Sequence, residues 1–176
     1  CWLGGTFTKS SFSKRVSPRP GELIPAVASV GYCAKKSPRL DKLIRNTAGA
    51  ERRLPWEQMF FDSKFGVPLS HQAAGDYAQV LEMVRWGPSA SNRQPWRVVK
   101  DGDVWHFYLQ RSPGYREGML VRLFTVADMQ RIDMGIAMCH FEFMARDQGL
   151  GGRWEIIAPD NEKSDELAEY TVSWVG

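Results

Sequence analysis

Hydroxyl and carboxamide side chains gather in one short stretch of the sequence, residues 87–96, which reads Gly-Pro-Ser-Ala-Ser-Asn-Arg-Gln-Pro-Trp. Its prolines, glycine and small polar residues cannot continue a helix or a central strand, so we expect a fixed loop. Such a loop offers hydroxyl, carboxamide and backbone donors in a small space, which suits the polar edge of a flat heteroaromatic ring. The alternative is a plain helix-to-strand connector in which Ser and Asn cap turns.

The string Pro-Ser-Ala-Ser-Asn-Arg-Gln-Pro-Trp-Arg closely resembles the flavin loop of the nitroreductase family. In that family the equivalent loop follows a helix, precedes a strand and lies against the isoalloxazine ring of FMN. The resemblance implies a nitroreductase-like α+β fold, with a central, mostly antiparallel sheet flanked by helices. It also implies that the flavin contacts come from Pro88, Ser89, Ala90, Ser91, Asn92 and Gln94.

Two segments near the start of the chain fit the same resemblance. Trp-Leu-Gly-Gly-Thr-Phe at residues 2–7 resembles the segment after the central helix of nitroreductases, whose backbone lies near the reactive side of the flavin. On its residues alone, the glycine pair favours a tight turn. A basic cluster just past an expected strand resembles the part that holds the FMN phosphate, although its composition alone favours a solvated loop. The cofactor-binding residues implied by these two segments are Leu3, Gly4, Gly5, Lys35, Lys36 and Arg39.

Local patterns predict the elements that position these groups. We expect helices over residues 10–16, 41–53 and 70–86, with Ser70 as an N-cap, and a buried strand over 23–32. Strands over 96–100 and 104–110 around Asp-Gly-Asp form a strong hairpin signal, and 153–158 with 170–175 suggest another pair. The spacing is that of a half-buried helix over 70–86, whose apolar, core-facing positions we expect to be Ala74, Tyr77, Val80, Leu81 and Val84.

The longest expected helix starts at an N-cap on Thr125, with Asp128 in a box-like arrangement, and ends at Gly149. We expect it to bury a wide apolar stripe comprising Ile132, Gly135, Ile136, Cys139, His140, Phe143 and Met144. A histidine on such a stripe is more often a core or helix-interface residue than a catalyst.

Composition limits the classes of function. The chain has 176 residues and a net charge of +3, which favours an anionic ligand such as a phosphate but is too small and scattered to indicate nucleic acid. The three cysteines form no Cys-x-x-Cys pair or metal-binding spacing and indicate reduced thiols in a cytoplasmic protein. No apolar run reaches the roughly 18 residues that a membrane-spanning helix needs.

The order of the segments differs from that of one nitroreductase domain, because the Gly-Gly and basic segments precede the Pro-Ser-Asn loop. We therefore expect residues 1–62 to be the C-terminal part of a first repeat and 63–176 to be a second. The chain would then be a fragment lacking its N-terminal part, and the full-length protein a monomeric pseudo-dimer of two half-similar repeats. The Arg-x-Ser-x-Arg motif of the family is replaced here by Phe-Phe-Asp-Ser-Lys at residues 60–64.

The resemblance implies an FMN-dependent oxidoreductase that passes electrons from NAD(P)H to a nitroaromatic, quinone or similar small-molecule acceptor. The flavin would do the chemistry, so we expect no catalytic side chain. A non-catalytic flavin-binding or sensor protein on the same scaffold is the alternative, and a basic structural or nucleic-acid-associated protein is a weaker one. Neither the acceptor nor the choice between NADH and NADPH follows from the sequence.

Overall fold

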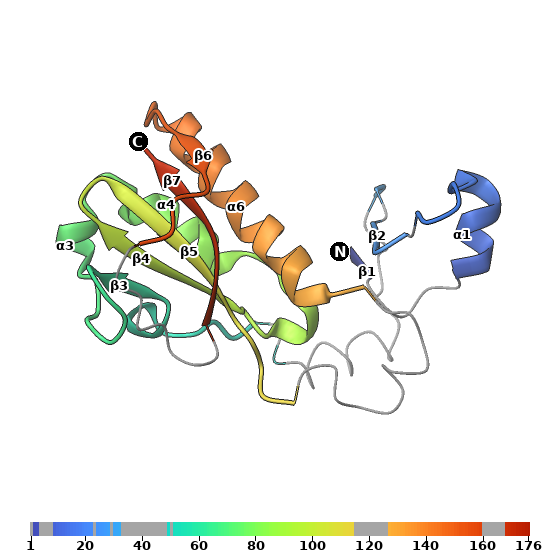
Figure 1. Ribbon diagram of the computed structural model, residues 1–176, viewed down its shortest axis with the longest axis horizontal. Helices are drawn as coiled ribbons and strands as arrows, with labels where there is room; N and C mark the ends of the chain where they lie inside the picture. Colours follow the sequence, from blue (N-terminus) through green and yellow to red (C-terminus); the bar gives the residue numbers. More distant parts are fainter. Residues whose placement is uncertain are drawn as a thin grey trace.

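A computed structural model describes residues 2–3, 9–22, 24–28, 30–32, 49, 51–114, 127–159 and 168–176 (Figure 1). The 3₁₀ turns are labelled η. In chain order the elements are β1 (Trp2–Leu3), α1 (Lys9–Val16), β2 (Val27–Ala28), η1 (Trp56–Gln58), β3 (Phe60–Asp62), α3 (His71–Ala74), α4 (Tyr77–Trp86), η2 (Ala90–Asn92), β4 (Trp96–Asp101), β5 (Val104–Gln110), α6 (Met129–Asp147), β6 (Arg153–Glu155) and β7 (Ala168–Val175).

A five-stranded sheet in the order β3-β4-β5-β7-β6 forms the centre of the fold. Only the β3–β4 pair is parallel, and the other neighbours are antiparallel. The β4–β5 hairpin turns at Gly102, whose φ of 57° lies in the left-handed region that glycine adopts without strain. The predicted hairpin and the predicted mixed α+β fold with a mostly antiparallel sheet are therefore confirmed.

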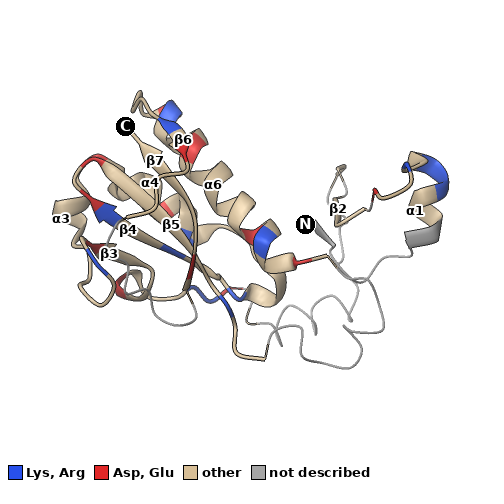
Figure 2. Ribbon diagram, viewed as in Figure 1, with Lys and Arg blue, Asp and Glu red and all other residues tan. Residues whose placement is uncertain are grey.

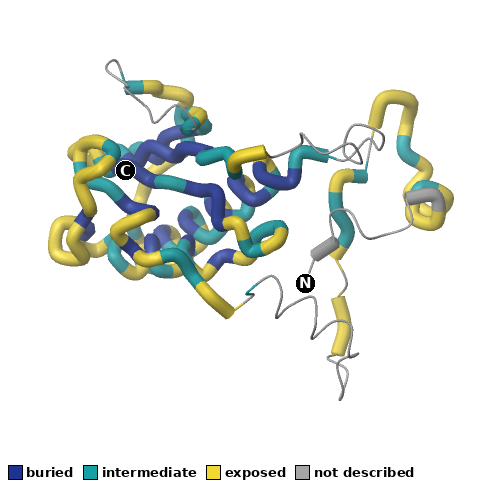
Figure 3. Tube along the Cα trace, turned by 90° about the horizontal axis from the view of Figure 1, so that it is seen from below, coloured by how far each residue is buried: buried dark blue, intermediate teal, exposed yellow. Residues whose placement is uncertain are grey.

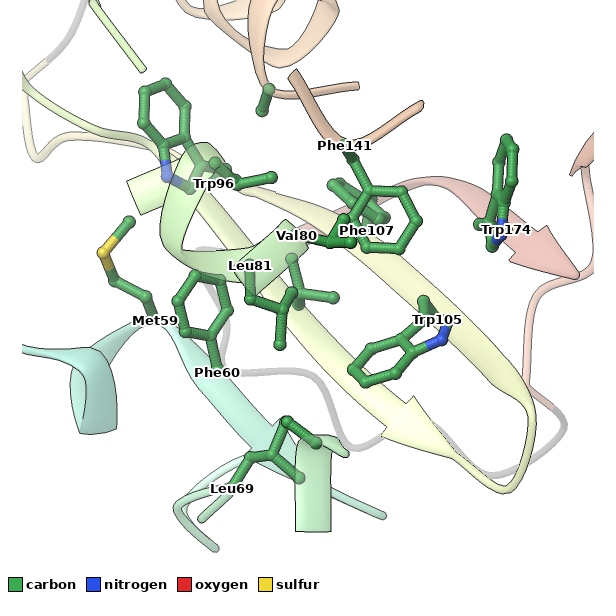
Figure 4. Packing of buried hydrophobic residues seen from close by; sticks show 14 of the residues in the cluster. Met59, Phe60, Leu69, Val80, Leu81, Trp96, Trp105, Phe107, Phe141 and Trp174 are labelled. Atoms are coloured by element: carbon green, nitrogen blue, oxygen red, sulfur yellow. The ribbon is translucent and has the colours of Figure 1, made fainter. Parts of the chain in front are cut away.

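Helices α4 and α6 pack against each other and against β4 and β5 (Figure 4). Alternate residues of β5 point toward these helices because successive side chains of a strand lie on opposite faces. Side chains from both helices and from the sheet form one buried hydrophobic cluster, which includes Val80, Leu81 and Val84 from α4, Trp105 and Phe107 from β5, Phe141 from α6 and Trp174 from β7. Burying these large apolar side chains supplies most of the driving force for folding.

The predicted helix over residues 70–86 is interrupted. Ser70 is the predicted N-cap, since its hydroxyl accepts a hydrogen bond from the Ala73 N–H, but α3 ends at Gly75. Gly75 has a φ of 57°, so the chain turns there before α4 begins. The predicted buried positions hold across both helices, with Tyr77 only half-buried.

Helix α6 corrects two predictions. Its N-cap is Asp128, whose carboxylate accepts from the Arg131 N–H, so the prediction of Thr125 was wrong. The helix also buries a different face from the expected stripe: Phe141 is fully buried, whereas Cys139 is exposed and Phe143 is 70% exposed. Both faces of α6 carry apolar side chains, and the buried face also carries Gln130 and Asp133, which hid it from the pattern.

The N-terminal elements differ from expectation as well. Helix α1 matches its prediction, but the expected buried strand over 23–32 is wrong, because β2 spans two residues and Val30 and Tyr32 are fully exposed. Strand β2 pairs with β1 in a separate antiparallel pair. In Figure 3 the buried stretches lie in the sheet and the helices packed on it, whereas the described part of α1 is mostly exposed. For the helix expected over 41–53, residues 51–53 are not helical, so its predicted end is wrong, and residues 41–48 and 50 lie outside the described part of the chain.

Within the described residues, no helix combines the length and the apolar character needed to cross a lipid bilayer.

Candidate functional site

The loop over residues 87–96 connects α4 to β4 and is fixed at both ends. Gly87 is buried, and a Cβ atom there would lie 3.0 Å from the Val84 carbonyl oxygen and 3.5 Å from the Trp96 ring. Trp96 itself is fully buried. Glycine therefore allows the end of α4 to lie directly against the first residue of β4.

The backbone of this loop adopts conformations that most residues avoid. Ser91, Asn92 and Gln94 have φ values of 50°, 53° and 48°, in the left-handed region. Each such residue costs about 1 kcal/mol or more, so the surrounding structure must hold it in place. Strain of this kind clusters at binding sites, which makes the loop a candidate site on backbone geometry alone.

Residues 49–54 hold the second half of the loop. The Asn92 Nδ2 donates to the carbonyl oxygens of Gly49 and Arg52 at 2.7 and 2.9 Å. The Leu54 N–H donates to Gln94 Oε1 at 2.9 Å. Within the loop, the Gln94 N–H donates to the Ser89 hydroxyl at 2.8 Å. Both carboxamides are thus engaged inside the chain, where they fix the loop conformation.

Helix α6 holds the first half of the loop through a buried carboxyl group. The Ala90 N–H donates to Asp133 Oδ1 at 2.9 Å, and Asp133 is fully buried. Its Oδ2 atom is buried without a hydrogen-bond partner. Burial raises the pKa of Asp133 to about 7, and the charge of Asp128 adds to this, whereas the hydrogen bond from Ala90 opposes it.

A basic rim borders the same loop. Arg53 donates to Asn92 Oδ1 at 3.3 Å and to the Trp86 carbonyl oxygen at 3.2 Å. Its guanidinium lies 5.4 Å from the centre of the Trp86 ring, and that of Arg85 lies 5.2 Å from it. Burial, followed by the charge of Arg85, lowers the pKa of Arg53. Positive charge therefore gathers beside the loop, although Arg85 is also paired with Glu82.

The structure places the predicted site residues unevenly. Pro88 and Ser91 are exposed, Gln94 is buried, and the loop residues Ser89, Ala90 and Asn92 are half-buried. Leu3 lies in β1. The other predicted residues lie outside the described part of the chain, so their contribution stays a prediction: Gly4, Gly5, Lys35, Lys36 and Arg39.

Two residues that hold the loop were missed by the sequence analysis. One feature of the sequence could have indicated Asp133, since it is an acid flanked by Ile132 and Met134 within an apolar helix. No local feature of the sequence indicates Arg53, because its contacts with Trp86 and Asn92 span 33 and 39 positions of the sequence.

We call the side of α6 that faces away from the sheet the outer face of α6. A separate hollow lies on this face. It is lined by Met83, Cys139, His140, Phe143, Met144 and Asp147. His140, expected in a core or at a helix interface, is half-buried at this hollow. No residue of the loop lines it, so the two features are distinct.

Comparison with known protein families matches residues 1–145 to the family described as "Putative TM nitroreductase". The matched range includes the whole loop and α6 up to Ala145. No curated protein and no solved structure matches the chain. The match covers most of the sequence and confirms the predicted family, although it does not test FMN dependence or the tandem repeats. The chain therefore belongs to this nitroreductase family, which is a family of oxidoreductases.

Proposed function

We propose that this protein is an FMN-dependent oxidoreductase that passes electrons from NAD(P)H to a nitroaromatic, quinone or similar small-molecule acceptor. One observation carries the proposal: the loop between α4 and β4 is held in a strained, left-handed conformation by two other parts of the chain. That loop lies within the range matched to the nitroreductase family.

The loop would contribute to flavin binding in two ways. It would form hydrogen bonds with the polar edge of the ring, and it would present a rigid surface to the ring. Ser91 is exposed, and its uncharged hydroxyl can donate or accept a hydrogen bond. Asn92 and Gln94 would contribute by holding this surface in place, since their amides bond within the chain. The guanidinium of Arg53 beside the loop would favour the anionic reduced form of the ring.

When bound, FMN would supply the redox chemistry between NAD(P)H and the acceptor. The chain would position the ring against the loop and exclude water from it. We further propose that Lys35, Lys36 and Arg39 bind the phosphate, and that the backbone of Leu3, Gly4 and Gly5 lies near the ring. No side chain is required as a general acid or nucleophile.

The outer face of α6 supports a related proposal, that the protein is a pseudo-dimer of two repeats. Exposed apolar side chains such as Phe143, beside an apolar hollow, are suited to cover by another part of a protein. In this proposal residues 1–62 end the first repeat and 63–176 form the second. A full-length protein that sediments as a monomer would agree with it, and a full-length homodimer would contradict it.

Turnover tests the proposed function. The purified protein, supplied with FMN, should oxidise NADH or NADPH only when a nitroaromatic or quinone is present. Replacing Ser91 with Ala should weaken FMN binding by about three- to tenfold, because it removes one hydrogen bond. Ser63→Ala is the matched control, since Ser63 is also exposed and has a φ of 59° but lies in a different loop.

The outcomes separate the candidate functions. FMN binding without turnover of any acceptor would favour the flavin-binding or sensor alternative. Failure to bind FMN at all would contradict the proposal. Equal effects of the two serine replacements would show that the loop is not where the flavin binds.

A further inference from the structure

The start of η2 presents a backbone donor that its own N-cap does not satisfy. The first N–H groups of any helical turn lack partners inside the turn, and an N-cap side chain commonly accepts from them. Ser89 occupies the N-cap of η2 but makes no such bond. Its hydroxyl instead accepts from the Gln94 N–H. The Ala90 N–H therefore depends on an acceptor from elsewhere in the chain.

Helix α6 supplies that acceptor from 43 residues away, through Asp133 Oδ1 at 2.9 Å. Two described cations near the start of α6 pair with other acids, because Arg111 and Arg131 both contact Asp128 and Glu169. Acidic and basic residues lie close together at the start of α6 in Figure 2. Among the described residues no ion pair includes Asp133, so the contact of its carboxyl group is the hydrogen bond from the loop.

We propose that Asp133 is a positioning residue, which caps η2 from α6 and so holds residues 88–94 in the conformation that the binding site uses. The loop is then clamped from two sides, by α6 at its start and by residues 49–54 at its end. The strained Ser91 lies between these clamps, and the strained Asn92 and Gln94 make the bonds of the second clamp. Loss of either clamp releases the strain by letting the loop relax.

The raised pKa of Asp133 agrees with this role. A buried carboxyl group without a cation takes up a proton near neutral pH, yet its Oδ1 atom still accepts from an N–H. An asparagine at this position can make the same hydrogen bond, whereas an alanine cannot. The pair of variants Asp133→Asn and Asp133→Ala therefore isolates the hydrogen bond from the charge.

The first test measures how often the loop opens in the protein without any ligand. In the unliganded protein, Asp133→Ala should increase amide hydrogen exchange across residues 90–94, and trypsin cleavage after the exposed Arg93, by about tenfold. Asp133→Asn should stay within about threefold of the wild type. Exchange in the β4–β5 hairpin should change little, which would show that the effect is local.

Gln130→Ala is the matched control. Gln130 is equally buried near the start of α6, but it bonds to Ser112 and not to the loop. It should destabilise this end of the helix without loosening residues 90–94. Should Asp133→Ala fail to fold, Asp133→Asn still decides: loosening of the loop by tenfold in that variant would overturn the proposal.

The second test measures FMN affinity by quenching of flavin fluorescence, and this part rests on the proposed function. We expect about tenfold weaker binding for Asp133→Ala and near wild-type binding for Asp133→Asn. If the wild type does not bind FMN but Asp133→Ala loosens the loop, the proposed function fails and the positioning role stands. If the loop is equally protected in wild type and Asp133→Ala, the positioning role is wrong whatever the FMN result.

Discussion

At the scale of single residues, the polar side chains of the loop have two roles. Ser91 is exposed, where a ligand can reach it, whereas Asn92 and Gln94 bond to another part of the chain and hold the loop. The hydroxyl and carboxamide groups gather within ten positions, so the sequence identified the loop. It could not show that Asn92 and Gln94 bond to residues 49–54, because those partners lie about 40 positions away. Which polar groups face a ligand and which hold the loop is decided by tertiary contacts.

Asp133 leads to a prediction about stability and pH. Its pKa is raised from the ordinary 3.8 to about 7 in the folded state, so the folded protein binds more protons than the unfolded chain between these values. The contribution of Asp133 to stability is therefore fully present below about pH 4 and is lost as the pH rises toward 7. The loss is up to about 4 kcal/mol, from roughly three pKa units.

Replacing Asp133 with Asn should remove this loss. The free energy of unfolding of the variant, relative to that of the wild type, should increase steadily from about pH 4 to about pH 7 and then level off. Urea unfolding at several pH values measures this difference. A difference that stays constant over the whole range would contradict the burial of an uncompensated carboxyl group.

At the scale of elements, locally encoded parts were predicted well. The β4–β5 hairpin follows from an alternating pattern around a single Asp-Gly-Asp turn, and Ser70 caps α3 through a contact three residues away. The facing of α6 was predicted wrongly because Gln130 and Asp133 lie on its buried side. Their partners, Ser112 and Ala90, belong to other elements, so periodicity alone could not show that these polar residues are satisfied.

Two phenylalanines that lie two positions apart can test which face of α6 is buried. Phe141→Ala should cost about 3–5 kcal/mol of stability, because Phe141 is fully buried among aromatic rings. Phe143→Ala should change stability by no more than about 0.5 kcal/mol, because that side chain is largely exposed. Urea unfolding of the two variants gives the comparison, and similar losses for both would show that the assigned face is wrong.

The connection into β6 contains a second matched pair. Gly149 and Gly152 have φ values of 72° and 150°, so alanine is strained at both, at a cost of about 1 kcal/mol. A Cβ atom at Gly149 meets open space, whereas one at Gly152 would overlap the indole ring of Trp174. Gly152→Ala should therefore cost about 1–3 kcal/mol more than Gly149→Ala in thermal or urea unfolding. Equal costs would mean that β6 does not pack against Trp174 in this way.

The whole molecule depends on contacts that no local pattern reveals. Strand β7 lies between β5 and β6, so the end of the chain enters the middle of the sheet. Strand β3 was not predicted at all, because its parallel pairing with β4 joins residues 38 positions apart, such as Phe60 and Val98. The family match ends at residue 145, yet Trp174 of β7 is fully buried in the same core.

The central claim also concerns the whole molecule: we propose that the clamped loop between α4 and β4 forms part of a flavin site. The most direct measurement is the visible absorption spectrum of the purified protein, with any compound released by heat identified by mass. We predict a yellow protein, or one that becomes yellow on reconstitution, which releases FMN. A colourless protein that takes up no FMN on reconstitution would contradict the claim and leave the clamped loop as a structural feature alone.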